Sequence, residues 1–195
     1  MRSLYNYIIS TNSRYDNKVS VGSKELILNT EITERDYLFV NRIGTVINAP
    51  INIKTPIESG NEVIVHHNVF RRWYDVRGNE RNSGNYIKED TYTVSEEQIF
   101  AYKQNGKWHC PIQYCFVEPL ENKDVWSTDS EQKLIGKLTY TNDYLSSFGL
   151  SCGDVVGFTP NSEYEFNIED KKLYRILSKD ITINYGHNEN KKVTS

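Results

Sequence analysis

The chain has 195 residues, of which 37% are hydrophobic, and this length fits either one large domain or two small ones. Its formal net charge of −3 argues against a protein drawn to nucleic acid or anionic membranes by overall charge. Three cysteines are too few for a disulfide framework, and no apolar run approaches the roughly 18–20 residues that span a bilayer. Because the N-terminus also lacks the apolar segment of a signal peptide, we expect a cytoplasmic protein with no membrane partner.

Short runs of β-branched and aromatic residues, punctuated by Gly, Asn and Asp, predict an all-β chain of sandwich or barrel type. In the first half we expect strands at 5–10, 42–48, 62–67, 86–94 and 99–102. In the second half we expect strands at 113–118, 133–140, 154–158, 164–168, 173–177 and 181–184. A Gln-Asn-Gly-Lys turn signal near the middle of the chain predicts domains at 1–104 and 105–186, followed by a flexible polar tail at 187–195.

Motifs of the first half recur in the second half in the same order. GNEV at 60–63 corresponds to GDVV at 153–156, and IGTV at 43–46 corresponds to IGKL at 135–138. The copies are 92–93 residues apart. Because solenoid units recur at roughly 20–50 residues, this longer spacing indicates a duplicated domain.

The two halves differ at two places. The first half has a long segment, 11–41, between its first two strands, where the second half has a shorter one, 119–132. The first half also has an additional segment at 72–90, for which we expect a hairpin. Extra length in a compact β domain is usually functional or disordered, so the binding site is sought in these two insertions.

Each half resembles the GroES co-chaperonin family. Residues 153–156 resemble its GD-x-V strand, and LYRILSKDI at 173–181 resembles its closing strand and turn. Weaker forms lie at 60–63 and 97–101, and the IGTV and IGKL motifs resemble the strand that follows the mobile loop of the family. The resemblance implies two tandem GroES-like small β-barrels that self-associate into a ring or another homo-oligomer. It further implies a co-chaperonin that caps a GroEL-like chaperonin ring and assists protein folding. The loose fit and the Asn-, Lys-, Ile- and Tyr-rich composition suggest a divergent, virus-encoded member, which would act in the host cytoplasm.

Members of this family dock through a short apolar tripeptide on the mobile loop. The resemblance places this chaperonin-binding tripeptide at Leu26, Ile27 and Leu28, within the insertion 11–41. Ser-Lys-Glu separates the triplet from the preceding glycine, which departs from the family pattern. Such a loop binds without catalysis, and a ring of weak loops gains strength through avidity. The alternative is that residues 25–28 form another core strand.

Other chemistry finds little support in the sequence. No nucleophile elbow, P-loop or dinucleotide turn is present, so we expect neither enzymatic activity nor a cofactor. His66 and His67 would face opposite sides of a strand, so we expect no metal site. The basic-aromatic cluster at 71–74, with Arg77 and Arg81, could stack on bases or form a solvated hairpin that covers a neighbouring subunit. Nearby acidic residues dilute its charge, so we favour the hairpin and expect no nucleic-acid partner.

A second function is compatible with the same sequence. The tandem barrels could belong to a structural assembly protein, for instance a virion component, that does not bind a chaperonin. The insertion 11–41 distinguishes the two, because a free co-chaperonin needs it flexible whereas a structural protein would bury it.

Overall fold

The computed structural model describes residues 2–15, 18–21, 24–27, 40–122, 130–169 and 171–187, with the backbone alone described at 18–21 and 24–27. The chain separates into two compact units, Met1–Gly106 and Lys107–Ser195. Strands dominate both units, and the α-helix α1 (Asp143–Ser147) has only five residues. The all-β prediction is therefore confirmed. Within the described ranges, no helix has the length and apolar character required to cross a membrane.

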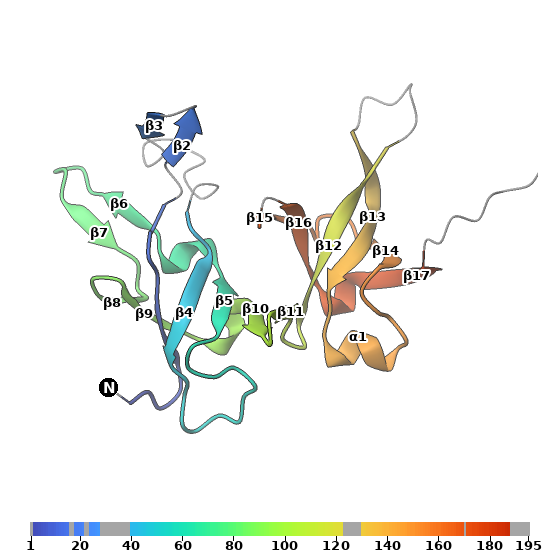
Figure 1. The fold of residues 1–195 in the computed structure, drawn as a ribbon, viewed down its shortest axis with the longest axis horizontal. Coiled ribbons are helices and arrows are strands. Elements are labelled where there is room, and N and C mark those ends of the chain that lie inside the picture. The colour runs from blue at the N-terminus through green and yellow to red at the C-terminus, as the bar shows by residue number, and fades with distance from the viewer. Residues whose placement is uncertain are drawn as a thin grey trace, which may run out of the picture. The chain divides into compact units, whose positions relative to one another are not determined.

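Ten strands form the described part of the first unit (Figure 1). They are β1 (Tyr7–Ser10), β2 (Lys18–Val21), β3 (Lys24–Ile27), β4 (Ile43–Asn48), β5 (Glu62–Val65), β6 (Arg72–Tyr74), β7 (Glu80–Asn82), β8 (Tyr86–Lys88), β9 (Thr91–Val94) and β10 (Ile99–Gln104). Short 3-10 turns at His67–Val69 and Glu96–Gln98 follow β5 and β9.

The described part of the second unit has seven strands in addition to α1. They are β11 (Lys107–His109), β12 (Tyr114–Glu121), β13 (Glu131–Tyr140), β14 (Asp154–Phe158), β15 (Tyr164–Ile168), β16 (Lys171–Leu177) and β17 (Ile181–His187). A 3-10 turn at Ser178–Asp180 joins β16 to β17, as the turn at Glu96–Gln98 joins β9 to β10.

The two units share one strand order. Within the first large sheet, six strands of the first unit follow the order β10-β5-β4-β1-β9-β8, and the sheet of the second unit follows β17-β14-β13-β12-β16-β15. When the strands are numbered in chain order within each unit, the two orders are the same, with β1 equivalent to β12 and β10 equivalent to β17. Neighbouring strands are antiparallel in both sheets.

Strand register agrees at the repeated IGTV and IGKL motifs. Gly44 in β4 and Gly136 in β13 pass equally close to the first strand of their units. A Cβ atom at Gly44 would lie 3.0 Å from the carbonyl oxygen of Ser10, and one at Gly136 would lie 3.0 Å from that of Glu118. Both oxygens belong to the backbone, so a side chain at either position would push the strands apart by a few tenths of an ångström, and glycine favours the close approach.

The turns before β5 and β14 are also equivalent. Gly60 and Gly153 have positive φ values of 92° and 100°, which favour glycine. The amide of Gly60 donates to the carbonyl oxygen of Val46 at 2.8 Å, and that of Gly153 donates to the carbonyl oxygen of Leu138 at 2.7 Å. The repeated motifs thus occupy matching places in the two units.

Each unit buries an apolar core of its own. The first core is centred on residues from β1, β4, β5 and β9, chiefly Tyr7, Ile9, Val46, Val63, Val65, Tyr92 and Val94. The second is built from β12, β13, β14 and β16 with a contribution from α1, and it contains Cys115, Val117, Leu138, Leu145, Val156 and Ile176. Consecutive residues are buried along β1, β5, β12 and β14, so these strands are covered on both faces.

The prediction of closed β-barrels is wrong for the described residues, because both large sheets are open. Closure requires the two end strands of a sheet to pair with each other. In the described part of the second unit, β17 pairs with β14 and β15 pairs with β16, and the two end strands do not meet. In the first unit, the three-residue strand β8 pairs with β9 alone among the described strands.

Two predicted strands differ in extent from those of the structure. β5 ends at Val65, so His66 and His67 lie beyond it, and their rings stack with centroids 4.2 Å apart. The expectation that they face opposite sides is wrong because strand alternation stops before them. The predicted strand 86–94 is divided into β8 and β9, because Asp90 adopts a left-handed backbone with φ 53°.

Candidate binding site

The predicted docking tripeptide falls on a hairpin inside the first insertion. β3 includes Leu26 and Ile27, whereas Leu28 lies outside the described residues. β3 pairs antiparallel with β2, and these two strands form a sheet separate from the large sheet of the first unit. The insertion 11–41 therefore contains a small β-element of its own between β1 and β4.

The base of this insertion is tied together by hydrogen bonds. Tyr15 and Val40 form an isolated antiparallel bridge, and both belong to the buried core of the unit. The Asn41 side-chain amide donates to Thr11 Oγ1 at 3.0 Å and to the carbonyl oxygen of Ser13 at 2.8 Å. The two ends of the insertion are thus fixed to each other at the edge of the core.

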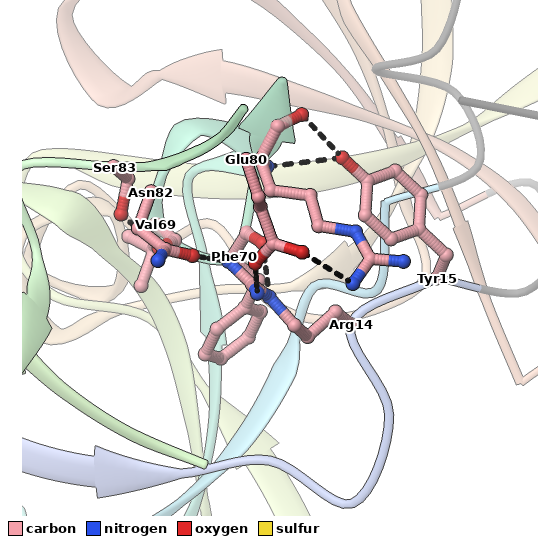
Figure 2. Close-up of polar contacts among 8 residues, drawn as sticks. Arg14, Tyr15, Val69, Phe70, Glu80, Asn82 and Ser83 are labelled. Carbon is pink, nitrogen blue, oxygen red and sulfur yellow. Dashed lines mark hydrogen bonds and ion pairs between the residues drawn. The ribbon is translucent and has the colours of Figure 1, made fainter. Parts of the chain in front are cut away.

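Arg14 connects this base to the second insertion, the hairpin of β6 and β7 (Figure 2). Its Nε donates to the carbonyl oxygen of Phe70 at 3.2 Å, just before β6. Its two terminal nitrogens lie 2.5 Å from Asn82 Oδ1 and 3.3 Å from Glu80 Oε1, both on β7. One guanidinium group therefore contacts both sides of the β6–β7 hairpin.

Tyr15 makes a second set of contacts with the same hairpin. Its hydroxyl oxygen lies 3.0 Å from both the backbone nitrogen and the carbonyl oxygen of Arg72, accepting from the first and donating to the second. The Arg72 guanidinium lies 5.7 Å from the centroid of the Tyr15 ring and 3.4 Å from Glu80 Oε2. Separately, the Ser83 hydroxyl donates to the carbonyl oxygen of Val69 at 2.7 Å, which ties the end of the hairpin to the 3-10 turn after β5. The two insertions are consequently joined through several polar contacts.

The turn of the β6–β7 hairpin is ordered by one carboxylate. Asp75 accepts hydrogen bonds from the backbone amides of Arg77 and Asn79, each at 2.9 Å, and pairs with Arg81 at 2.9 Å. The amide of Asn79 is the main reason why the pKa of Asp75 is lowered from its usual value. The charged carboxylate thus bridges the two sides of the turn.

Three large side chains on this hairpin are exposed to solvent. Trp73, Tyr74 and Val76 are 48%, 52% and 105% exposed, respectively. Trp73 also borders a hollow of about 510 Å³ whose other walls are Asn68, Arg71, Ser83, Gly84 and Asn85. An ordered hairpin that presents aromatic and aliphatic groups to water is suited to protein contact.

The histidine pair, His66 and His67, directly precedes Asn68, one of the residues that line this hollow. The Nδ1 atom of His66 accepts a hydrogen bond from the backbone amide of Asn68 at 3.1 Å. Burial, followed by the proximity of His66, Arg42 and Arg71, lowers the pKa of His67 to about 3. His67 is therefore neutral at physiological pH. Across the described ranges, no three His, Cys, Asp or Glu side chains are grouped so that they could hold a metal ion.

The second unit differs from the first at the positions that correspond to the two insertions. Its strands β12 and β13 continue as one antiparallel ribbon to Glu121 and Glu131, and the amide of Asn122 donates to the carbonyl oxygen of Ser130 at 2.9 Å. Trp126, the largest apolar residue of this shorter segment, lies outside the described residues. Between β14 and β16 the second unit has only β15, the counterpart of β8, and no described counterpart of β6 and β7.

The sequence located both insertions but did not indicate that they touch. Arg14 and Tyr15, which join them, belong to no motif, and their partners lie 56–68 residues further along the chain. The only sequence signal was the basic-aromatic composition at 71–74. No protein-family model and no curated protein sequence matches this chain. The geometry of these two insertions is therefore the guide to function.

Proposed function

We propose that this protein is a co-chaperonin, which caps a chaperonin ring and assists protein folding. In this proposal Leu26, Ile27 and Leu28 are the residues that dock into the ring. The observation that carries the proposal is that β2 and β3, within the insertion 11–41, pair in a sheet separate from the large sheet, on a base tied together by Tyr15 and Asn41. A hairpin that is fixed at its base and does not pair with the large sheet is suited to binding a partner.

The organisation of the chain supports the same proposal. Two units with one strand order and equivalent glycines, at Gly44 and Gly136, fit a duplicated GroES-like domain. A single apolar tripeptide binds weakly, because ordering it costs conformational entropy. Assembly of several copies into a ring makes later contacts intramolecular, so that weak segments together hold the partner and can still release it. The proposed activity is binding without catalysis.

Replacement of the tripeptide by serine tests the proposal. The full-length variant Leu26→Ser/Ile27→Ser/Leu28→Ser should lose binding to a purified GroEL-type chaperonin ring, because each large aliphatic side chain contributes roughly 1.5–3 kcal/mol when buried. Its melting temperature should stay close to that of the wild type, because β3 is not part of the large sheet. Co-sedimentation with the ring, with and without nucleotide, and thermal melting by circular dichroism measure the two effects.

A matched control separates docking from a general loss of apolar surface. Serine at Leu4, Ile51 and Ile112, which are 53%, 61% and 59% exposed and lie outside both insertions, should leave binding unchanged. A tripeptide variant that unfolds several kcal/mol more easily would instead identify residues 25–28 as a core strand. A wild-type protein that does not bind the ring in any nucleotide state would refute the co-chaperonin proposal and favour a structural assembly protein.

A further inference from the structure

The two insertions occur together and only in the first unit. Along the described residues the second unit matches the first in strand order and register, yet it has a short β12–β13 ribbon in place of one insertion and no counterpart of the β6–β7 hairpin. The two insertions are also in direct contact through Arg14 and Tyr15. We expect two insertions to act in one function when they occur in the same copy of a duplicated domain and contact each other.

In the view of Figure 1, β2 and β3 are drawn toward the same end of the first unit as β6 and β7. Only a short stretch of chain separates β2 from the residue that contacts the β6–β7 hairpin. Tyr15 is only three residues before the start of β2 and its hydroxyl is bonded to the first residue of β6. A partner that receives the β2–β3 hairpin would therefore come close to the β6–β7 hairpin.

The charges of the β6–β7 hairpin are largely satisfied within the unit. Glu80 contacts both Arg14 and Arg72, and Asp75 pairs with Arg81. Because these guanidinium groups already have carboxylate partners, the hairpin offers apolar and aromatic contact in preference to a free basic surface. Fewer cationic groups of the hairpin are then available to phosphates than its arginine content suggests, which disfavours nucleic acid as the partner.

We propose that the β6–β7 hairpin is a second docking element, which contacts the same chaperonin ring as the tripeptide through Trp73, Tyr74 and Val76. The proposal rests on the co-chaperonin function proposed above. The exposed aromatic and aliphatic groups require an apolar surface on the ring next to the groove that takes the tripeptide. The hairpin is ordered before binding by Asp75 and Arg14, so its docking involves a smaller loss of conformational entropy than that of an unstructured segment.

The test compares serine variants of the full-length chain. Trp73→Ser/Tyr74→Ser/Val76→Ser should weaken binding to a purified GroEL-type ring by about tenfold or more, because aromatic residues at the centre of an interface often dominate its affinity. The matched control is Tyr144→Ser/Phe148→Ser, which removes an exposed aromatic pair from the second unit, with ring centroids 5.0 Å apart. This control should bind like the wild type. Affinities are measured by biolayer interferometry, and folding is checked by circular dichroism.

A second measurement covers the case in which the triple variant does not fold. A photo-cross-linking amino acid at Val76, whose side chain is fully exposed at the turn, should cross-link to the chaperonin ring, whereas the same group at Phe148 should not.

The second-docking proposal is overturned if the hairpin variant folds and binds like the wild type while the tripeptide variant does not bind. It is also overturned if the hairpin variant changes only the oligomeric mass of the protein, which would identify a contact between copies. Failure of the wild type to bind the ring refutes the proposed function itself, and is thus distinguishable from both results.

Discussion

Removal of the Arg14 side chain should release the β6–β7 hairpin from the base of the insertion 11–41. The substitution Arg14→Ala takes away the donor to the carbonyl oxygen of Phe70 and the contacts with Glu80 and Asn82. The carbonyl oxygen of Phe70, in a partly buried position, then loses this charged donor.

The expected loss of stability follows from the surroundings of each contact. A hydrogen bond from a charged donor contributes about 1.5–3 kcal/mol. The ion pair with Glu80 adds about 0.5 kcal/mol, because the Glu80 side chain is 38% exposed and water screens the interaction. The guanidinium also lies 5.7 Å and 5.9 Å from the ring centroids of Tyr86 and Tyr92, and such a contact is worth about 0.5–1 kcal/mol. Because neighbouring contacts are not additive, we expect a total of about 3 kcal/mol.

Urea unfolding of the full-length chain measures this loss, and hydrogen exchange locates it. The control is Arg81→Ala, which breaks the 2.9 Å ion pair with Asp75 on the same hairpin. The Arg81 side chain is 58% exposed, so this change should cost less than about 1 kcal/mol. Backbone amides of β6 and β7 should exchange faster in Arg14→Ala than in the wild type. If Arg14→Ala is no more destabilising than Arg81→Ala, then Arg14 does not hold the hairpin.

Two further predictions concern backbone packing and pH. Gly44→Ala should lower the free energy of unfolding in urea by about 1–3 kcal/mol, because its Cβ would lie 3.0 Å from the backbone oxygen of Ser10. The control Gly84→Ala, whose Cβ would have no atom within 4 Å, should change that free energy by less than about 0.5 kcal/mol. Equal effects of the two substitutions would refute this account. The backbone amide of Ser151 lowers the pKa of Asp154 from its usual 3.8, so Asp154 stabilises the fold above that value and this contribution is lost as the pH falls through the lower pKa of the folded state. Asp154→Asn should therefore flatten the pH dependence of unfolding below about pH 4, and an unchanged dependence would contradict the role of this carboxylate.

The amino-acid sequence by itself determined the fold class and the repeat. Short runs of β-branched and apolar residues are a local property of each strand, so β4, β5, β13 and β14 could be predicted from their own residues. The glycines at 44, 60, 136 and 153 were visible as motifs at matched spacing, because each is required by its immediate backbone conformation or by close strand approach. The positions of the two insertions followed from the same comparison of the halves.

The tertiary structure alone decided how these parts meet. Open sheets, in contrast to the closed barrels expected, depend on which end strands pair, and that choice involves residues far apart in the chain. The stacking of His66 and His67 depends on β5 ending at Val65, which no local pattern indicated. The contacts of Arg14 with the β6–β7 hairpin join residues 56–68 positions apart. Such contacts arise only when the sheet order brings the end of β1 next to that hairpin, because strand periodicity specifies which way a side chain faces but not which distant residue it will face.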